Sequence, residues 1–327
     1  MTHVGVIGGG AWGTALAQVA AANGPVTIWA REAEVIEGIN RDHVNEAFLP
    51  GVPLDPGVRA TGDLDDVGAC DMWLVVTPAQ FLRSVLAQAP TRADRPVVLC
   101  SKGIEAGSGK LMSEAAEEAD PGAAIAVLSG PTFAHEVAKG LPTAITLACA
   151  DEAIGERLAA RLARPGFRPY WTDDVIGAEV GGAVKNVLAI ACGVVVGRGL
   201  GENAKAALIA RGFAEMSRFG VAKGAKASTL GGLSGLGDLV LTCSSPQSRN
   251  MSLGMGLGQG RSAAELLSNR RTVAEGAFTA PVLLAAAREL GVDMPITEAV
   301  VDLLDGKVSV DAAVERLLSR PRRAEGI

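Results

Sequence analysis

The chain has 327 residues, of which 48% are hydrophobic, 20% charged and 4% aromatic. This length predicts about two domains, and the composition excludes an intrinsically disordered protein and one that needs disulfides to hold its core. The formal net charge of −6 and the scarcity of aromatic residues argue against nucleic-acid binding and against an anionic membrane surface as a partner.

The first half of the chain alternates short apolar segments with helical patterns, as in a parallel sheet with helices on both faces. We expect strands at Val4–Ile7, Val26–Ala30, Met72–Thr77, Val97–Ser101, Ile125–Ser129, Ala144–Ala148 and Arg168–Trp171. We expect helices at Thr14–Ala22, Ala79–Gln88, Lys110–Glu118 and Glu152–Arg164.

Beyond about Gly177 the pattern becomes wholly helical. We expect helices at Ala178–Gly197, Ala204–Phe219, Ala263–Asn269, Thr279–Leu290, Ile296–Asp305 and Val310–Leu318, with glycine-rich loops between some of them. The fold class is therefore α/β, a Rossmann-like doubly wound sheet followed by an all-helical domain. We divide the chain into residues 1–180, a dinucleotide-binding domain, and residues 181–327, a substrate-binding and catalytic domain.

The N-terminus carries no basic segment followed by an apolar one, so we expect no signal peptide. Five widely spaced cysteines and three histidines offer no zinc pattern and are typical of reduced, buried thiols. We therefore expect a cytoplasmic protein without a bound metal.

A glycine-rich turn follows the first predicted strand. Gly8, Gly10 and Gly13 fit the GxGxxG pattern, and a helical pattern begins at Thr14. Gly8 allows a tight turn, Gly10 lets a pyrophosphate approach the backbone, and Gly13 lets the helix pack on the strand. A strand on one side and a helix on the other favour a dinucleotide site over an ordinary glycine-rich turn.

Arg31 follows the second predicted strand, where an enzyme that prefers NAD usually has an acidic residue. An arginine suits the 2′-phosphate of NADP, although Glu32 and Glu34 lie close by. We therefore expect NADP or NAD as the cofactor, with NADPH favoured; a solvent-exposed arginine without this role is the alternative.

Further polar residues follow the other predicted strands, at the edge where ligands of such sheets bind. They are Thr77-Pro78, Ser101-Lys102 and Ser129-Gly130-Pro131-Thr132. Lys102 is equally compatible with a surface charge.

The helical half contains a basic segment that ends in a polar cluster. Residues 181–250 hold eight Lys or Arg against three Asp or Glu, in a chain that is acidic overall. This excess favours a small anionic ligand, and Arg249 between Ser248 and Asn250 suits phosphate; a polar surface loop is the equally compatible alternative. Lys185 and Asn186 stand among apolar residues: they are either boundary residues or a functional amine and its neighbour, whose burial would lower the lysine pKa.

Taken together, the motifs resemble those of the bacterial type of the NAD(P)-dependent glycerol-3-phosphate dehydrogenase family over nearly the whole chain. The matching segments are Gly8–Ala17, Phe48–Gly51, Ser101–Glu105, Ser129–Ala134, Leu141–Ala144, Lys185–Val187, Gly201–Ile209, Gly235–Leu239, Thr242-Cys243, Ser248–Asn250 and Glu275-Gly276. The chain departs from the family pattern at Ala11, where serine is frequent, and at Ala274, where valine is common.

The resemblance implies reversible reduction of dihydroxyacetone phosphate to sn-glycerol 3-phosphate with NAD(P)H, a supply of that product for phospholipid synthesis, and a homodimer. It makes Lys185 the proton donor and acceptor at the C2 oxygen. The implied substrate-binding residues are Lys102, Gly130, Thr132, Lys185, Asn186, Asp238, Thr242, Ser248, Arg249 and Asn250. The implied cofactor-binding residues are Gly8, Gly10, Ala11, Trp12, Gly13, Arg31, Lys102, Ala134, Arg249, Val273 and Glu275.

Elementary electrostatics agrees with these roles. Hydride transfer to a carbonyl carbon leaves negative charge on the oxygen, which an ammonium group stabilises and then protonates. Lys102 should lower the Lys185 pKa by repulsion, and Asp238 could orient one of the amines. Two rival functions fit the same fold less well. One is an oxidoreductase acting on a 3-hydroxy acid or a 6-phosphogluconate-like substrate, and the other is a non-catalytic NADP sensor.

Overall fold

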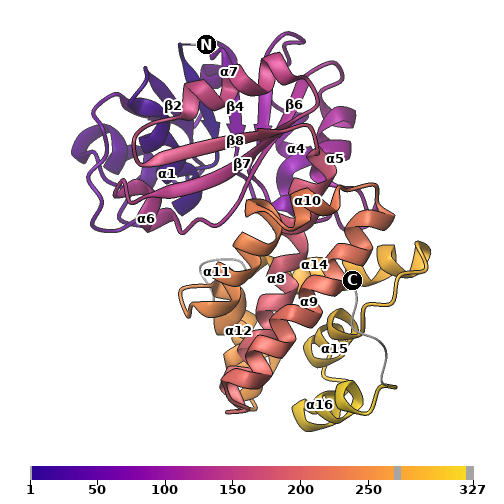
Figure 1. Cartoon of the computed structure of the whole chain (residues 1–327). Helices are drawn as coiled ribbons and strands as arrows, with labels where there is room; N and C mark the ends of the chain where they lie inside the picture. The colour runs from indigo at the N-terminus through magenta and orange to yellow at the C-terminus, as the bar shows by residue number, and fades with distance from the viewer. Residues whose placement is uncertain (1, 269–273, 322–327) are drawn as a thin grey trace. The chain divides into compact units, whose positions relative to one another are not determined.

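The computed structural model describes residues 2–268 and 274–321 and divides the chain into two compact units (Figure 1). The first comprises residues 1–101 and 112–175, and the second comprises residues 102–111 and 176–327. The predicted single boundary at residue 180 differs from this division, because the segment 102–111 belongs to the helical unit. Ile104 and Leu111, each 1% exposed, lie in the apolar core of that unit.

The first unit is built on an eight-stranded sheet of order β3-β2-β1-β4-β5-β6-β7-β8. Its strands are β1 (Val4–Ile7), β2 (Val26–Trp29), β3 (Val58–Thr61), β4 (Met72–Val75), β5 (Pro96–Leu99), β6 (Ala124–Ser129), β7 (Thr143–Cys149) and β8 (Phe167–Thr172). Every predicted strand is present, and β3 is additional. Its sequence, with an exposed arginine between buried residues, gave a weak apolar signal.

One pair of strands departs from the predicted parallel sheet. β6 and β7 run antiparallel, whereas all other neighbours are parallel. The helix between them, α6 (Ala134–Ala138), has five residues and a length of about 7.5 Å. It is too short to bring the chain back along a six-residue strand of about 20 Å, so the chain reverses direction instead.

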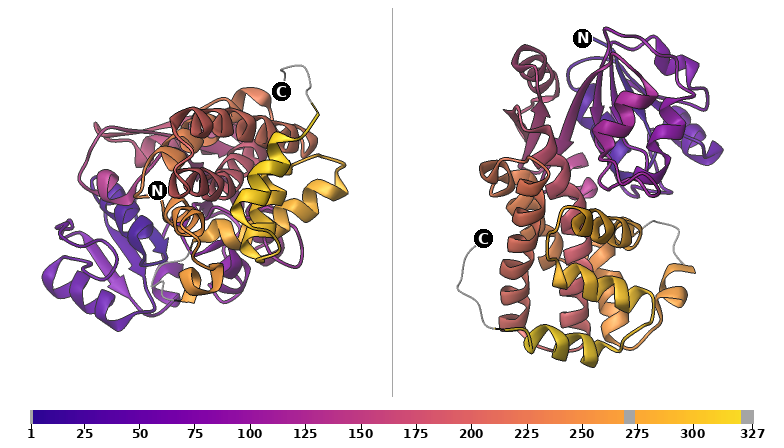
Figure 2. Two further views of the ribbon diagram at one scale, coloured as in Figure 1. Left: turned by 90° about the horizontal axis from the view of Figure 1, so that it is seen from below. Right: turned by 90° about the vertical axis from the view of Figure 1, so that its right-hand side faces the viewer.

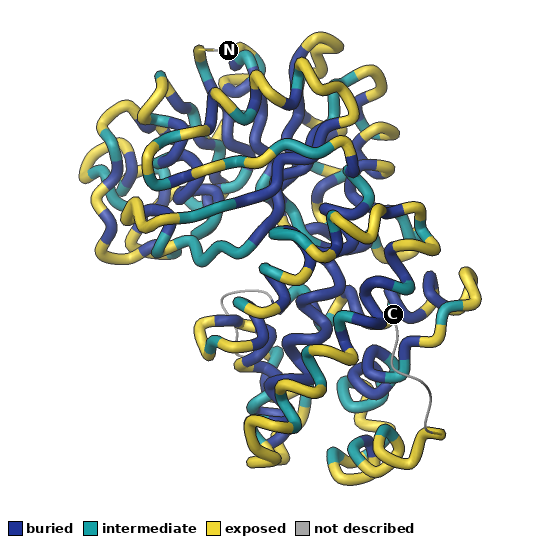
Figure 3. The backbone as a smooth tube through the Cα atoms, viewed as in Figure 1, coloured by how far each residue is buried: buried dark blue, intermediate teal, exposed yellow. Residues whose placement is uncertain are grey.

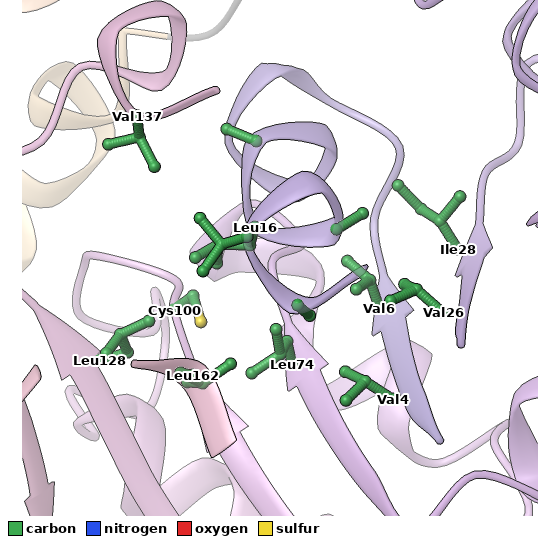
Figure 4. Close-up of a cluster of buried hydrophobic side chains, with 14 of the residues drawn as sticks. Val4, Val6, Leu16, Val26, Ile28, Leu74, Cys100, Leu128, Val137 and Leu162 are labelled. Carbon is green, nitrogen blue, oxygen red and sulfur yellow. The ribbon is translucent and has the colours of Figure 1, made fainter. Parts of the chain in front are cut away.

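Helices and strands of this unit share an apolar core. Its helical elements are α1 (Ala11–Ala21), α2 (Ala33–Glu37), η1 (Gly38–Asp42), α3 (Asp65–Gly68), η2 (Ala79–Phe81), α4 (Leu82–Leu86), α5 (Met112–Ala119), α6 and α7 (Glu152–Leu162). Figure 4 shows Leu16 of α1 packed above Val6 and Leu74, at the centre of the sheet. This packing fixes the start of α1 at the carboxyl end of β1.

The regular elements of the second unit are all helices within its described residues. Its elements are α8 (Val175–Gly197), α9 (Glu202–Ala222), α10 (Ala227–Leu230), η3 (Leu233–Gly237), α11 (Asp238–Ser244), α12 (Arg249–Gly258), α13 (Ala263–Ser268), α14 (Glu275–Glu289), α15 (Pro295–Leu304) and α16 (Val310–Leu318). The six predicted helices are present, although residue 269 lies outside the described residues. The short elements α10, η3 and α11, together with α12, replace the predicted loops.

Helix α8 forms the centre of this unit. Every residue from Gly177 to Val195 is buried, which Figure 3 shows as a continuous dark blue segment. The helix is long and apolar enough to cross a membrane, but 89% of its most apolar window is buried inside the protein. Its apolar composition therefore reflects a core position, and any polar side chain on it is buried as well.

Helices α8 and α12 approach each other through glycines. A Cβ atom on Gly193 would lie 2.1 Å from the Met251 carbonyl oxygen, and one on Gly254 would lie 2.0 Å from the Ile190 carbonyl oxygen. One turn later, a Cβ on Gly197 would lie 2.2 Å from the Met255 carbonyl oxygen, and one on Gly258 would lie 2.5 Å from the Val194 carbonyl oxygen. The two backbones are thus in direct contact, which only glycine permits. Figure 2 shows the helices of this unit from two further directions.

We expect Gly254→Ala to destabilise the protein strongly, by roughly 1–3 kcal/mol or more, because the added methyl group overpacks a contact between two backbones. Thermal or urea unfolding of the purified protein measures this. Gly231→Ala is the matched control, since Gly231 has an ordinary φ of −74° and its Cβ would lie 3.5 Å from the nearest atom. Equal stability of the two variants would contradict the packing described above.

Candidate active site

The glycine-rich turn connects β1 to α1 and is compact. Gly8 has φ +130°, and a Cβ on it would lie 2.9 Å from the Val76 carbonyl oxygen. A Cβ on Gly13 would lie 1.8 Å from the Gly8 carbonyl oxygen, so the first residues of α1 are in direct contact with the glycine-rich turn. Gly10 precedes α1 in the N-cap position, and its Cβ would meet nothing within 4 Å. The turn therefore leaves open space at the start of α1.

The open space at Gly10 fits a dinucleotide. The first backbone N–H groups of a helix and its positive dipole end bind pyrophosphate, and Gly10 leaves room for it. Ala11 and Trp12 form the first turn of α1, and the indole Nε1 of Trp12 is buried without a hydrogen-bond partner among the described residues. An unpaired buried donor is typical of a site completed by a ligand.

Asn45 holds this turn in place, and the sequence analysis did not identify it. Its Nδ2 donates to the Gly9 carbonyl oxygen at 2.9 Å and to Thr14 Oγ1 at 2.7 Å. Asn45 is 1% exposed and lies in the loop after η1. No local pattern marks the residue as a support for this turn, because Gly9 and Thr14 lie more than thirty positions earlier in the chain.

Arg31 lies two residues beyond β2, and its side chain is 72% exposed. Its Nη2 is 3.6 Å from Glu32 Oε1, so the acidic neighbour noted in the sequence does pair with it. An exposed pair of this kind is weak and easily exchanged for another partner.

The second unit contains a buried charge cluster centred on Asp238, the first residue of α11. Lys185 Nζ donates to Asp238 Oδ1 at 2.7 Å, and Lys102 Nζ donates to Asp238 Oδ2 at 2.7 Å. Lys185 Nζ also donates to Thr242 Oγ1 at 3.0 Å. Asp238 is completely buried, and the side chains of Lys185 and Lys102 are 8% and 13% exposed. One carboxylate therefore serves both amines, where the sequence suggested that it orients one of them.

Burial governs the acidity of Lys185. Loss of hydration lowers its pKa to about 8, while the Asp238 carboxylate opposes this shift. The positive charge of Lys102 lowers the Lys185 pKa further, as expected, but contributes less than burial does. Lys185 is thus not a boundary residue, and its amine gains or loses a proton near neutral pH.

Two buried asparagines and the backbone of a buried glycine form a chain of hydrogen bonds that includes the neighbour of Lys185. Asn250 Nδ2 donates to Asn186 Oδ1 at 2.9 Å, and the Gly276 backbone N–H donates to Asn250 Oδ1 at 3.0 Å. A Cβ on Gly276 would lie 2.5 Å from the Asn186 carbonyl oxygen, so glycine is required there. The sequence showed Gly276 only as part of a family motif, and its contact with Asn186 joins α14 to α8.

The other predicted residues lie within one unit or the other. Ser248 caps α12, its Oγ accepting from the Met251 N–H at 3.2 Å, and Arg249 is the exposed first residue of that helix. Glu275 begins α14. In the first unit, Gly130 and Thr132 follow β6, with Thr132 Oγ1 donating to the Gly130 carbonyl oxygen at 3.2 Å, and Ala134 begins α6. Val273 lies outside the described residues.

Comparison with known proteins places these features in one family. The model described as the N-terminus of NAD-dependent glycerol-3-phosphate dehydrogenase matches residues 3–155, and its C-terminal counterpart matches residues 174–315. A relative in Sphingopyxis alaskensis, named glycerol-3-phosphate dehydrogenase, NAD(P)+, is 61% identical and aligns over 99% of this chain and 98% of its own length. A relative of the same name in Caulobacter vibrioides is 61% identical over 98% of both chains.

Solved structures give the same result. The crystal structure of glycerol-3-phosphate dehydrogenase from Coxiella burnetii is 36% identical, covers 98% of this chain and 99% of its own, and has a TM-score of 0.93. The yeast enzyme is 30% identical, covers 96% and 98%, and has a TM-score of 0.83. The chain therefore belongs to the NAD-dependent glycerol-3-phosphate dehydrogenase family and is an NAD(P)-dependent oxidoreductase.

Proposed function

We propose that this dehydrogenase reduces dihydroxyacetone phosphate reversibly to sn-glycerol 3-phosphate, with Lys185 exchanging the proton at the C2 oxygen. The observation that carries this proposal is the buried Lys185–Asp238–Lys102 cluster, in which two amines share one carboxylate at 2.7 Å each. Such a cluster keeps a net positive charge, so it favours a group on which negative charge develops.

The turn that contains Gly8, Gly10 and Gly13 would hold the dinucleotide with Ala11 and Trp12, joined by Arg31, Lys102, Ala134, Arg249, Val273 and Glu275 by resemblance. When bound, the nicotinamide supplies or accepts the hydride. The residues of the second unit stabilise the negative charge that hydride transfer leaves on the C2 oxygen. The Lys185 ammonium stabilises the developing oxyanion and donates its proton to it, and the neutral amine takes the proton back in the reverse direction.

The surrounding residues orient the amine and the substrate. Asp238 and Thr242 hold Lys185 Nζ from two sides, which fixes the direction in which its remaining proton points. By resemblance to the family, we assign the substrate phosphate to Ser248, Arg249 and Asn250, and the same resemblance adds Gly130 and Thr132. Binding a phosphate remote from the reacting carbon restricts the motion of the carbonyl and lowers the entropic barrier. Asn186, fixed by Asn250, lies beside Lys185 in sequence and completes the reacting end.

By resemblance to the family, we further propose that the enzyme acts as a cytoplasmic homodimer. Glycerol 3-phosphate is the backbone of glycerophospholipids, so its supply for phospholipid synthesis is the proposed role in the cell.

Replacing Lys185 tests the assignment most directly. We expect Lys185→Met to lower kcat by about 100-fold or more, the usual size of a general acid–base contribution. The Kd of NADPH should stay within the error of the measurement. Absorbance of NADPH with dihydroxyacetone phosphate measures turnover, and Lys307→Met, which removes an exposed lysine paired with Asp305, is the control. Near-normal turnover by Lys185→Met would refute the role of this residue.

The pH dependence should have opposite sign in the two directions. Reduction needs the protonated amine, so its kcat/KM should fall as the pH rises through about 8, the pKa of Lys185. Oxidation of glycerol 3-phosphate needs the neutral amine, so its kcat/KM should rise over the same interval. Initial rates from pH 6 to about 10, corrected for the equilibrium of the reaction, measure both profiles. Parallel profiles in the two directions would exclude Lys185 as the exchanging group.

Arg31 should set the cofactor preference. We expect Arg31→Gln to lower kcat/KM for NADPH by roughly tenfold, the effect of losing a charge-assisted hydrogen bond to the 2′-phosphate. The value for NADH should change little, because the arginine is exposed and pairs weakly. Steady-state kinetics with each cofactor gives the ratio, and an unchanged ratio would place the 2′-phosphate elsewhere.

A further inference from the structure

Six side-chain atoms of the first unit are buried without a hydrogen-bond partner among the described residues, and three of the six follow or end strands at one edge of the sheet. These three are Trp12 Nε1 after β1, Thr77 Oγ1 after β4 and Ser129 Oγ at the end of β6. β1, β4, β5 and β6 are parallel neighbours in that order, so their carboxyl ends share this edge. Unpaired buried groups are rare and costly, and three at one edge indicate a ligand there.

Thr77 occupies a special position at this edge. The strand order reverses between β1 and β4, and ligands of doubly wound sheets bind where it does so. Ile7 of β1 pairs with Val75 of β4, so Gly8 and Thr77 follow two strands that end at the same level. A Cβ on Gly8 would lie 3.3 Å from the Thr77 backbone nitrogen. Thr77 therefore touches the first glycine of the turn that binds the dinucleotide.

The backbone of Thr77 is held, whereas its hydroxyl is not. The Ser101 hydroxyl donates to the Thr77 carbonyl oxygen, and the residue is only 5% exposed. Thr14, a second buried threonine at the same turn, has its hydroxyl bonded to Asn45. The Thr77 hydroxyl is a donor in a fixed place without a protein acceptor within the described chain.

We propose that the Thr77 hydroxyl is a cofactor-binding group that donates a hydrogen bond to a phosphate or ribose oxygen on the nicotinamide side of the dinucleotide. This part is common to NADH and NADPH, so the contact adds affinity for both without choosing between them. Arg31, beyond β2, makes the choice. The inference rests on the nicotinamide cofactor of the proposed function but not on the substrate.

The test compares Thr77→Val, which replaces the hydroxyl with a methyl group of similar volume, with Thr77→Ser, which keeps a hydroxyl. Titration calorimetry or cofactor fluorescence gives the Kd of NADH and of NADPH, without substrate. We expect Thr77→Val to raise both Kd values about 5- to 10-fold, the effect of one lost hydrogen bond, with an unchanged ratio between them. Thr77→Ser should stay close to the original values.

Thermal unfolding without cofactor separates binding from a structural role. Because the Thr77 hydroxyl has no protein partner, Thr77→Val should leave the Tm of the cofactor-free protein unchanged or raise it. Thr279→Val is the matched control: Thr279 is 1% exposed, lies in the helical unit, and its hydroxyl likewise has no partner among the described residues. It should likewise not lower the Tm, and it should leave both Kd values unchanged.

Three results would overturn the inference. They are unchanged Kd values in Thr77→Val, a lowered Tm in its cofactor-free form, or a loss confined to NADPH, which would place the contact at the 2′-phosphate. These readouts do not depend on turnover. A protein that binds both cofactors as described but does not reduce dihydroxyacetone phosphate would refute the proposed function and leave the assignment of Thr77 intact.

Discussion

A carboxylate without access to water needs compensating charge, and in this protein the second unit is organised around one. Asp238 is completely buried and receives a hydrogen bond from an amine on each of its oxygens. The two lysines come from segments far apart in sequence, one before the helical half and one on its central helix. Removing the carboxylate would leave two ammonium groups facing each other in a medium of low polarity. One ionic requirement thus links α11, the segment 102–111 and α8, which also share the apolar core of this unit.

Each unit also uses an asparagine to hold the backbone at a glycine. In the first unit Asn45 donates to the Gly9 carbonyl oxygen, and in the second Asn250 accepts from the Gly276 N–H. Glycine gives backbone the freedom to approach a ligand or a helix closely, but the same freedom makes it costly to order. A buried carboxamide offers both a donor and acceptors, so one side chain can fix such a segment. The backbone at Gly9 and at Gly276 is therefore held in place by the same kind of side chain.

The sequence predicted what depends on local patterns. Apolar segments and helical periodicity located the sheet and the long helices, and the turn at Gly8–Gly13 was readable because a strand and a helix flank it. The roles of Lys102, Lys185 and Asp238 were inferred from family motifs, because the spacing of these residues along the chain does not show that their side chains meet. Asn45 could not be found, because its partners are set by the tertiary fold. The antiparallel β7 was missed because strand direction depends on how far a connection can reach.

The sequence analysis also did not predict the glycine-rich helix α12. The sequence analysis placed no helix at Gly254 and Gly258, where glycine has low helix propensity, yet α12 is helical and both glycines lie against α8. Tertiary contact here outweighs an intrinsic preference of about 1 kcal/mol per glycine.

The contact between α8 and α12 has a consequence for how the enzyme tolerates heat and sequence drift. Most helix pairs are separated by side chains, which change rotamer as temperature rises and change size as sequences diverge. At Gly193 and Gly254 the two helices are instead separated only by peptide backbone. The backbone has no rotamers, and its size does not change with the amino-acid sequence. Asn186 lies on α8 and Asn250 on α12, so the distance between them does not depend on how side chains repack elsewhere in the core. Substitutions elsewhere in the core can therefore leave the spacing of Asn186 and Asn250 unchanged.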